Sequence, residues 1–220
     1  MGTRRGLFHL HTWHSFDGLL PPWAYLAHAR RARLDFLCVT DHNTLAGALT
    51  VAAANHDPRL EVVIGAEYAT ERADLIGLFL TEEVRSRRFH EAVGEIHAQG
   101  GIAVLPHPYR HRGDALDEEL VAAVDAVEVF NARSSEVENG RALDVARRHG
   151  KPELAGADAH TLWELLRGGT LIELEGDAPL REALLSAPRT FTTRRTARTV
   201  RRYSQVVKRV RQRLGLPGAR

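Results

Sequence analysis

Thiols are almost absent from this sequence, which has one cysteine, Cys38, among its 220 residues. A single cysteine cannot form a disulfide within the chain, so nothing in the sequence indicates an oxidising compartment. The shortage of thiolates also argues against copper(I) and iron–sulfur sites, which depend on cysteine ligands. Cys38 itself lies inside an apolar run, where we expect it to fill space in the core.

Long apolar runs are missing as well. Nowhere do about 18 apolar residues follow one another, which is the length that a transmembrane helix needs. Residues 1–6 are basic, but histidines follow them in place of the apolar core of a secretion signal. We therefore expect a cytoplasmic protein with no transmembrane segment.

Acidic residues are missing from the end of the chain, because residues 189–220 hold eleven Lys or Arg and no Asp or Glu. The other 19 basic residues stand against all 28 acidic ones, so residues 1–188 carry a net charge of −9. With 44% hydrophobic residues, the chain is long enough for one domain with a sizeable core. We expect an acidic domain over residues 1–190 and a basic tail over residues 191–220.

Apolar runs that end in histidine or an acid are the main feature that is present. The first run leads into His9 and His11, which share one face of an extended strand and can offer two imidazoles to one ion. Four later runs end in the same way, in Thr40-Asp41-His42, Gly65-Ala66-Glu67, Pro106-His107-Pro108 and Asp158-Ala159-His160. This repetition indicates a metal site.

Strand-like runs alternate with helical segments along the chain. After the strand that carries His9, we expect strands at residues 35–40, 60–66, 75–80, 102–105, 126–130, 154–157 and 170–174. We expect helices at residues 21–29, 44–55, 87–99, 116–124, 136–149, 162–166 and 179–185. Such alternation is typical of α/β proteins, and about seven units favour a closed barrel, with its chemistry at the carboxyl ends of the strands. The near-continuous apolar runs predict parallel strands.

Together these motifs resemble those of the PHP (polymerase and histidinol phosphatase) domain family over residues 6–190. The motifs are His9-Leu10-His11-Thr12 with Asp17-Gly18, Thr40-Asp41-His42-Asn43-Thr44, Gly65-Ala66-Glu67, Pro106-His107-Pro108 and Gly156-Ala157-Asp158-Ala159-His160-Thr161. The resemblance implies a distorted (β/α)7 barrel that carries up to three metal ions, followed here by a basic C-terminal helix.

The resemblance also implies a role for each motif residue. His9 and His11 would bind one metal together with Asp158, and Glu67 would bridge this metal to a second one held by His107. These roles make the PHP-type centre polynuclear.

A third metal would fall to Asp17, His42 and His160 by the same resemblance. Many family members have histidine where Asp17 stands, and histidine where Asp74 stands before the next strand. Aspartate can bind a metal at either place. Asp74 also suits a solvated turn.

Imidazole nitrogens and carboxylate oxygens make up this donor set, which favours two or three divalent ions of Mn, Fe or Zn. Three such ions bring six positive charges, and four carboxylates return four negative ones: Asp17, Glu67, Asp74 and Asp158. A centre that stays net positive attracts an anion. We therefore expect a small anionic phosphate ester as the substrate.

The expected reaction is metal-assisted hydrolysis, in which a metal-bridging hydroxide attacks phosphorus. Asp41, His42 and His14 are near enough in sequence to protonate the leaving alcohol, although Asp41 also suits orienting a metal ligand. Arg110 and Arg133 follow strand ends, where a guanidinium can clamp phosphate oxygens. Both arginines also suit an ordinary surface position.

Other titratable residues carry less information. Glu128 stands inside a strand between Val127 and Val129, and the sequence leaves open whether it belongs to a buried pair or to the site. His14 is better explained as structural. Five further histidines have no partner at ligand spacing: His28, His56, His90, His97 and His149.

The basic tail has apolar residues at helical spacing between residues 200 and 214, namely Val200, Tyr203, Val206, Val207, Val210 and Leu214. One interpretation is a helix that packs this stripe on the acidic domain. The other is a basic arm for nucleic acid or an anionic membrane surface. Only Tyr203 is aromatic, which weakens the nucleic-acid interpretation.

Three functions stay open on the sequence. The first is a metal-dependent phosphoesterase for small phosphomonoesters such as a sugar, amino-alcohol or nucleotide phosphate. The second is a nuclease that acts on DNA or RNA ends, and the third is a metal-binding regulatory module without catalysis. Every ligand position holds a competent residue, which favours an enzyme. Glu67 and His107 are 40 residues apart, without the insertion that relatives acting on nucleoside bisphosphates often carry.

Overall fold

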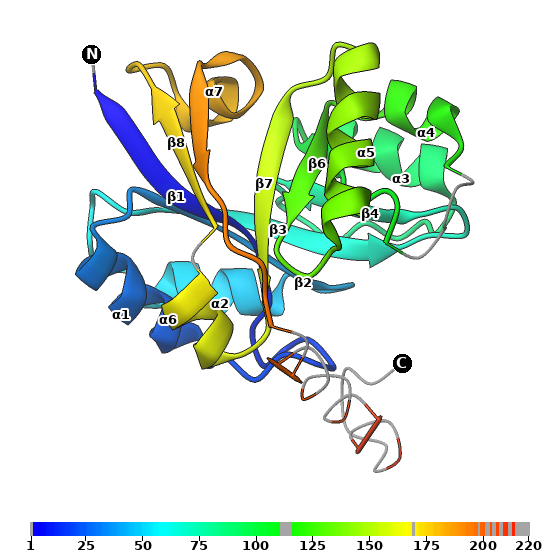
Figure 1. Ribbon diagram of the computed structural model, residues 1–220. Coiled ribbons are helices and arrows are strands. Elements are labelled where there is room, and N and C mark those ends of the chain that lie inside the picture. Colours follow the sequence, from blue (N-terminus) through cyan, green and yellow to red (C-terminus); the bar gives the residue numbers. More distant parts are fainter. Residues whose placement is uncertain are drawn as a thin grey trace.

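The computed structural model describes residues 2–110, 116–168 and 170–197, together with residues 199, 200, 203, 206, 209, 210 and 213. In this part of the chain, seven strands close a mixed barrel and seven helices cover it (Figure 1). The barrel strands are β1 (Thr3–Leu10), β2 (Phe36–His42), β3 (Glu61–Ala69), β4 (Asp74–Leu78), β5 (Ile102–Leu105), β6 (Ala126–Asn131) and β7 (Glu153–Ala159). The α/β barrel that the alternating pattern predicts is therefore confirmed.

Helices connect most of the strands. They are α1 (Pro22–Ala32), α2 (Ala46–Ala54), α3 (Phe89–Ala98), α4 (Glu118–Ala123), α5 (Glu136–Arg148), α6 (Leu162–Gly168) and α7 (Leu180–Ser186). Two further strands, β8 (Leu171–Glu175) and β9 (Arg189–Thr192), extend the sheet outside the barrel. The start of β1 pairs with β8, and its end pairs with β7, which closes the ring.

Strand β4 runs antiparallel to both of its neighbours, so the prediction of parallel strands is wrong there. A short turn joins β3 to β4, with the backbone N of Thr70 donating to the O of Ala73 at 3.2 Å. A turn this short can join only antiparallel strands. The reversal places Asp74, the first residue of β4, opposite Ala69 at the end of β3.

The barrel interior changes from apolar to polar along each strand. Phe36 and Cys38 of β2 belong to a buried apolar cluster, and His42 continues the same side of the strand. On β3, Val63 of the same cluster is followed by Glu67 at the same two-residue period. Cys38 is fully buried, as expected. The apolar cluster fills one end of the barrel and leaves a polar set of side chains at the other.

The basic tail lies largely outside the described residues, including Val207 and Leu214 of the predicted stripe. Tyr203, Val206 and Val210 are described in helical conformation, with 59%, 53% and 49% of their surface exposed. The packing of the stripe on the acidic domain is therefore not observed at these three residues, whereas Val200 is half-buried and lines a pocket together with Trp163. No helix among the described residues has the length and apolar character needed to cross a membrane.

Candidate metal centre

The ends of the strands bring the predicted metal ligands to one end of the barrel. His42 ends β2, Glu67 lies near the end of β3, and Asp158 lies near the end of β7. Asp74 joins them because β4 runs the other way. Four sets of side chains each have ligand atoms within 4.8 Å of one another: His9, His11 and Glu67; His11, His42 and His160; Glu67, Asp74 and His107; and His9, His107 and Glu128.

Glu67 lies at the middle of this cluster and is 1% exposed. Its Oε1 is 3.0 Å from Nε2 of His107. Its Oε2 is 3.2 Å from Nε2 of His9, 3.2 Å from Nδ1 of His42 and 3.4 Å from Nε2 of His11. A carboxylate whose two oxygens face different imidazoles can bridge two ions, and the family resemblance predicts this role for Glu67.

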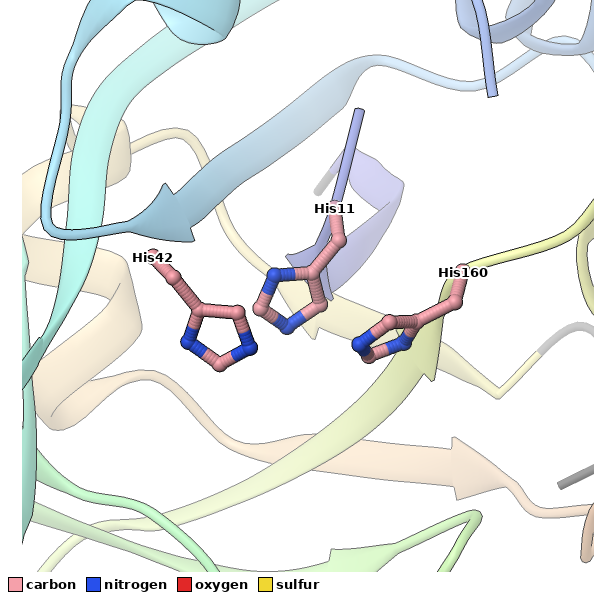
Figure 2. Close-up of side chains that lie close together, drawn as sticks. All are labelled: His11, His42 and His160. Carbon is pink, nitrogen blue, oxygen red and sulfur yellow. The ribbon is translucent and has the colours of Figure 1, made fainter. Parts of the chain in front are cut away.

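Two aspartates complete the cluster. Oδ1 of Asp158 lies 3.3 Å from Nε2 of His11 and 3.3 Å from Nδ1 of His160. Oδ1 of Asp17 lies 3.2 Å from Nε2 of His160 and 3.5 Å from Nε2 of His42. The three imidazoles of His11, His42 and His160 converge (Figure 2). The centroid of the His11 ring lies 4.2 Å from that of His160 and 4.5 Å from that of His42. The structure thus brings all nine predicted ligands together.

Three buried atoms in the cluster make no hydrogen bond to the described part of the chain: Nε2 of His11, Oδ1 of Asp17 and Oδ1 of Asp158. Leaving a buried polar atom without a hydrogen bond costs about 1–3 kcal/mol. All three atoms face other polar atoms of the cluster, where a bound cation would satisfy them. Nitrogen and carboxylate donors without thiolate suit Mn, Fe or Zn. The residues therefore fit divalent metal ions.

The charges of the cluster keep its carboxylates ionised. Burial alone would raise the pKa of Glu67, but the facing His9 and His42 outweigh it and hold that pKa well below its usual value. For His42, burial acts to lower the pKa, yet the charge of Glu67 raises it to about 9. Burial lowers the pKa of His11 well below its ordinary value. Glu67 is thus ionised and His11 neutral, which are the states that bind a metal, whereas His42 has to release a proton when a metal binds.

The backbone at three of the ligands adopts left-handed conformations, which are rare without glycine. The φ angles are 64° at His9, 26° at His107 and 45° at Asp158. The pairing of β1 with both neighbours also shifts register around His9, as in a β-bulge. Bulges and left-handed residues redirect side chains at functional sites, and surrounding contacts must hold them in place.

Glu128 of β6 supplies such contacts and is completely buried. Its Oε1 lies 2.8 Å from Nδ1 of His9, and its Oε2 accepts a hydrogen bond from the backbone N of His107 at 2.7 Å. Because Nδ1 of His9 is engaged by Glu128, Nε2 is the nitrogen that faces Glu67. The sequence leaves the role of Glu128 open. The hint that the sequence gives is a single glutamate inside an apolar strand, where a buried charge needs a partner.

Asp41 is buried beneath the loop that carries Asp17. It accepts hydrogen bonds from N and Oγ1 of Thr12 at 2.6 and 2.7 Å and from Oγ of Ser15 at 2.6 Å. Ser15 Oγ in turn accepts a hydrogen bond from the backbone N of His42 at 3.0 Å. Among described residues, every hydrogen bond of the Asp41 side chain goes to this loop. The contacts favour positioning of the loop over the supply of a proton.

Arg110 and Arg133 lie at the edge of the cluster, with side chains 18% and 12% exposed. Nη1 of Arg110 contacts Oδ2 of Asp158. Nη1 of Arg133 lies 3.1 Å from Nδ1 of His160, and its Nε lies 3.2 Å from Oε1 of Glu164. Neither arginine is therefore an ordinary surface residue.

An α/β barrel with a buried cluster of histidines and carboxylates at one end is the class of protein that these observations define. Residues 8–175 match the PHP domain family, and the chain belongs to this family. It is 36% identical over 118 residues to an uncharacterized protein of Methanocaldococcus jannaschii, with 53% of this chain and 69% of that protein covered.

Two solved structures have similar folds. One is a two-domain protein from Bacteroides vulgatus that contains a predicted PHP-like metal-dependent phosphoesterase. It has a TM-score of 0.66 and 19% identity, with 79% of this chain and 58% of that chain covered. The other is PsfC from Pseudomonas syringae, with a TM-score of 0.66, 18% identity and 97% and 100% of the two chains covered. At these identities the likeness concerns the fold.

Proposed function

We propose that this protein is a metal-dependent phosphoesterase that hydrolyses small phosphate monoesters, in the class of sugar, amino-alcohol and nucleotide phosphates. The observation that carries the proposal is Glu67, whose two oxygens face separate imidazole groups beside two partly buried arginines. When bound here, divalent ions supply Lewis-acid polarisation of the phosphate and activation of water. The products are inorganic phosphate and the free alcohol.

The residues of the chain divide the work of holding these ions. One ion would lie among His9, His11, Glu67 and Asp158, a second among Glu67, Asp74 and His107, and a third among Asp17, His42 and His160. Metal binding requires ionised carboxylates. Glu67 and Asp158 are ionised at neutral pH because the pKa of each is well below its usual value. Asp41 keeps the loop of Asp17 in place through Thr12 and Ser15.

Arg110 and Arg133 bind and orient the phosphate. A guanidinium offers five N–H donors in a planar fork, which matches the oxygens of a phosphate. Nη1 of Arg110 contacts Oδ2 of Asp158, so its guanidinium holds a positive charge at the edge of the cluster, where it attracts a phosphate. The position of Arg133 beside His160 sets a second donor on the same side of the cluster.

The test is hydrolysis of an aryl phosphate by protein loaded separately with Mn, Fe and Zn, together with elemental analysis. Glu67→Ala and His107→Ala should lose both metal and activity, because they remove the bridging carboxylate and its facing imidazole. His97→Ala removes an exposed imidazole that pairs with Asp125, and it should keep both. Bound metal without turnover on any phosphate ester would favour the non-catalytic module instead.

The place where the basic tail begins favours a second candidate function, action on nucleic-acid ends. Nε of Arg195 donates a hydrogen bond to the backbone O of Ser134 at 3.1 Å, and Ser134 follows Arg133 in the chain. The tail therefore begins beside the cluster, and residues 198–220 hold eight Lys or Arg and no acid. If the protein is a nuclease, truncation after Ala197 should abolish action on an oligonucleotide and retain action on an aryl phosphate. Retention of both activities would contradict this candidate.

A further inference from the structure

Large apolar side chains are exposed on one part of the molecule. Among the described residues, those that expose between 49% and 71% of their surface lie on α1, α2 and α6, in the loop before α1 and on the tail, with one exception. The exception is Val137 on α5. Single exposed apolar residues are common on protein surfaces, but a contiguous group of them marks a surface that contacts a partner or a membrane.

The elements that carry these residues adjoin one another. Helix α1 packs against both α2 and α6 (Figure 1). The loop before α1 is held to the segment before α6, because the backbone N of Leu19 donates to the O of His160 at 2.8 Å. The tail begins against α6, where Val200 lines a pocket together with Trp163. The apolar face is defined here by four exposed residues of the loop, α1 and α6, namely Trp13, Trp23, Leu162 and Leu166.

Acidic side chains are missing from the surface of the same helices. Helices α1 and α2 contain no Asp or Glu. Helix α6 contains only Glu164, which is 5% exposed and paired with Arg133. Each of the four other helices of the described chain exposes a glutamate: Glu91, Glu118, Glu136 and Glu182. The acidic domain therefore keeps its helical acids away from the apolar face.

Basic residues accompany the apolar face. Arg30 and Arg31 are exposed in the last turn of α1, and residues 198–220 hold eight Lys or Arg and no acid. On the tail, the exposed Tyr203, Val206 and Val210 are spaced by three and four residues, which places them on one side of a helix. An apolar side among basic residues is typical of a helix that lies in the interface of a membrane.

A bilayer with anionic lipids fits this surface better than nucleic acid or a second copy. Indole rings favour the headgroup region, and aliphatic side chains such as Leu162 and Val206 gain by entering the acyl layer beneath it. Bases of a nucleic acid stack on aromatic rings but offer little to aliphatic groups. A second copy joined through the same face would bring two basic tails together, and like charges repel.

We infer that the apolar face and the tail form a peripheral membrane-binding surface for a bilayer that contains anionic lipids. The four residues of the apolar face enter the interface together with the apolar side of the tail, and the basic residues contact the lipid headgroups. Such binding goes beyond the proposed function and does not require hydrolysis of a phosphate ester.

Vesicle sedimentation with the full-length, metal-loaded protein tests the inference. One set of vesicles is phosphatidylcholine alone, and the other contains about one-third phosphatidylserine. We expect binding to the anionic vesicles to be about tenfold stronger or more, because each Lys or Arg near the surface adds to the attraction. High salt should reduce this difference, since it screens the charges.

Trp23→Ser/Leu166→Ser should weaken binding to the anionic vesicles about tenfold or more, because it removes two apolar groups from the interface. Val206→Ser/Val210→Ser on the tail should act in the same direction without touching the barrel. Val137→Ser is the matched control, since it removes an exposed aliphatic side chain from a helix that exposes acids. The control should bind as the unmodified protein does, and circular dichroism checks the fold of each variant.

Equal binding to both kinds of vesicle, or none to either, would overturn the inference. So would unchanged binding in the two double variants, or an equal loss in Val137→Ser. Binding of a single-stranded oligonucleotide without binding of vesicles would assign the surface to nucleic acid instead. A dimer that Trp23→Ser/Leu166→Ser dissociates, again without vesicle binding, would assign it to a second copy. Failure of the proposed function leaves all these results unaffected, because none of them depends on turnover.

Discussion

His9 and His107 both reach the metal centre from left-handed backbone positions, and one buried residue holds the two in place. Glu128 faces Nδ1 of His9 with one oxygen and the backbone N of His107 with the other, at 2.8 and 2.7 Å. A histidine whose second nitrogen is fixed in this way keeps one tautomer and one ring orientation. We assign Glu128 the role of aligning two ligands.

Glu128→Gln tests this role with almost no change in shape. The amide oxygen can still accept a hydrogen bond from the backbone N of His107. The amide carries no charge, however, and presents an N–H group at one of the two oxygen positions. We expect metal affinity to fall about 10–100-fold, measured by competition with a chelator. The exposed Glu61 provides the control, since Glu61→Gln should bind metal as the unmodified protein does. Unchanged affinity in Glu128→Gln would remove the assigned role.

Cys38 gives a prediction about pH. Burial raises the pKa of its thiol, whereas the unfolded thiol ionises near pH 8.5. Because the folded-state pKa is the higher one, the contribution of this group to stability is complete below about pH 8.5 and is lost as the pH rises. We expect a loss of about 1.4 kcal/mol per pH unit above pH 9, measured by denaturant unfolding. Cys38→Ala should lack this component, and identical slopes in both proteins would contradict the prediction.

At the scale of secondary structure, β6 and β7 pair irregularly around the metal centre. Their register shifts between Glu128 and Phe130. Gly156 lies on the neighbouring strand, and a Cβ there would come within 1.6 Å of Oε1 of Glu128. The bulge and the glycine together make room for a glutamate inside the barrel.

Gly156→Ala should therefore damage stability and metal binding together. The new methyl group forces Glu128 away from His9, and overpacking of this kind costs about 1–3 kcal/mol. Denaturant unfolding and elemental analysis measure the two effects. Gly140→Ala on α5 is the control, because a Cβ there meets nothing within 4 Å and should stabilise the helix by about 0.5–1 kcal/mol. A Gly156→Ala protein with full stability and metal content would refute this account.

Inside the barrel, an apolar cluster fills one end and the buried charges lie at the other. Three carboxylates there, Asp17, Glu67 and Asp158, are at most 9% exposed. Oδ1 of Asp17 and Oδ1 of Asp158 make no hydrogen bond within the described chain. Metal ions are therefore expected to contribute to the stability of the fold.

Chelation should accordingly destabilise the protein. An ion at 100 times its Kd adds about 2.7 kcal/mol to the free energy of unfolding. For a chain of this size, that corresponds to roughly 5–10 °C in Tm. Thermal unfolding of protein dialysed against a chelator, and then reloaded with Mn, Fe or Zn, measures the shift. Glu67→Ala should show little response to reloading, and a Tm indifferent to metal in the unmodified protein would contradict the prediction.

The sequence by itself determined the barrel and the position of its chemistry, because both follow from local rules. Alternation of strands and helices is visible along the chain, and the parallel strands place residues such as His42 and Asp158 at one end. The two-residue period of a strand predicts that His9 and His11 share a face. In the structure both face Glu67, although His9 lies in a bulge and His11 follows the end of β1.

Tertiary structure decided what depends on distant partners. The reversal of β4, which brings Asp74 to the centre, comes from pairing with β3 and β5. Glu128 reaches His9 across 119 residues, and Arg195 reaches Ser134 across 61. Hydrogen bonds between such separated segments form only when the barrel closes. They leave no periodic pattern in the sequence, and for that reason the support of the ligands and the place where the tail begins emerged only from the fold.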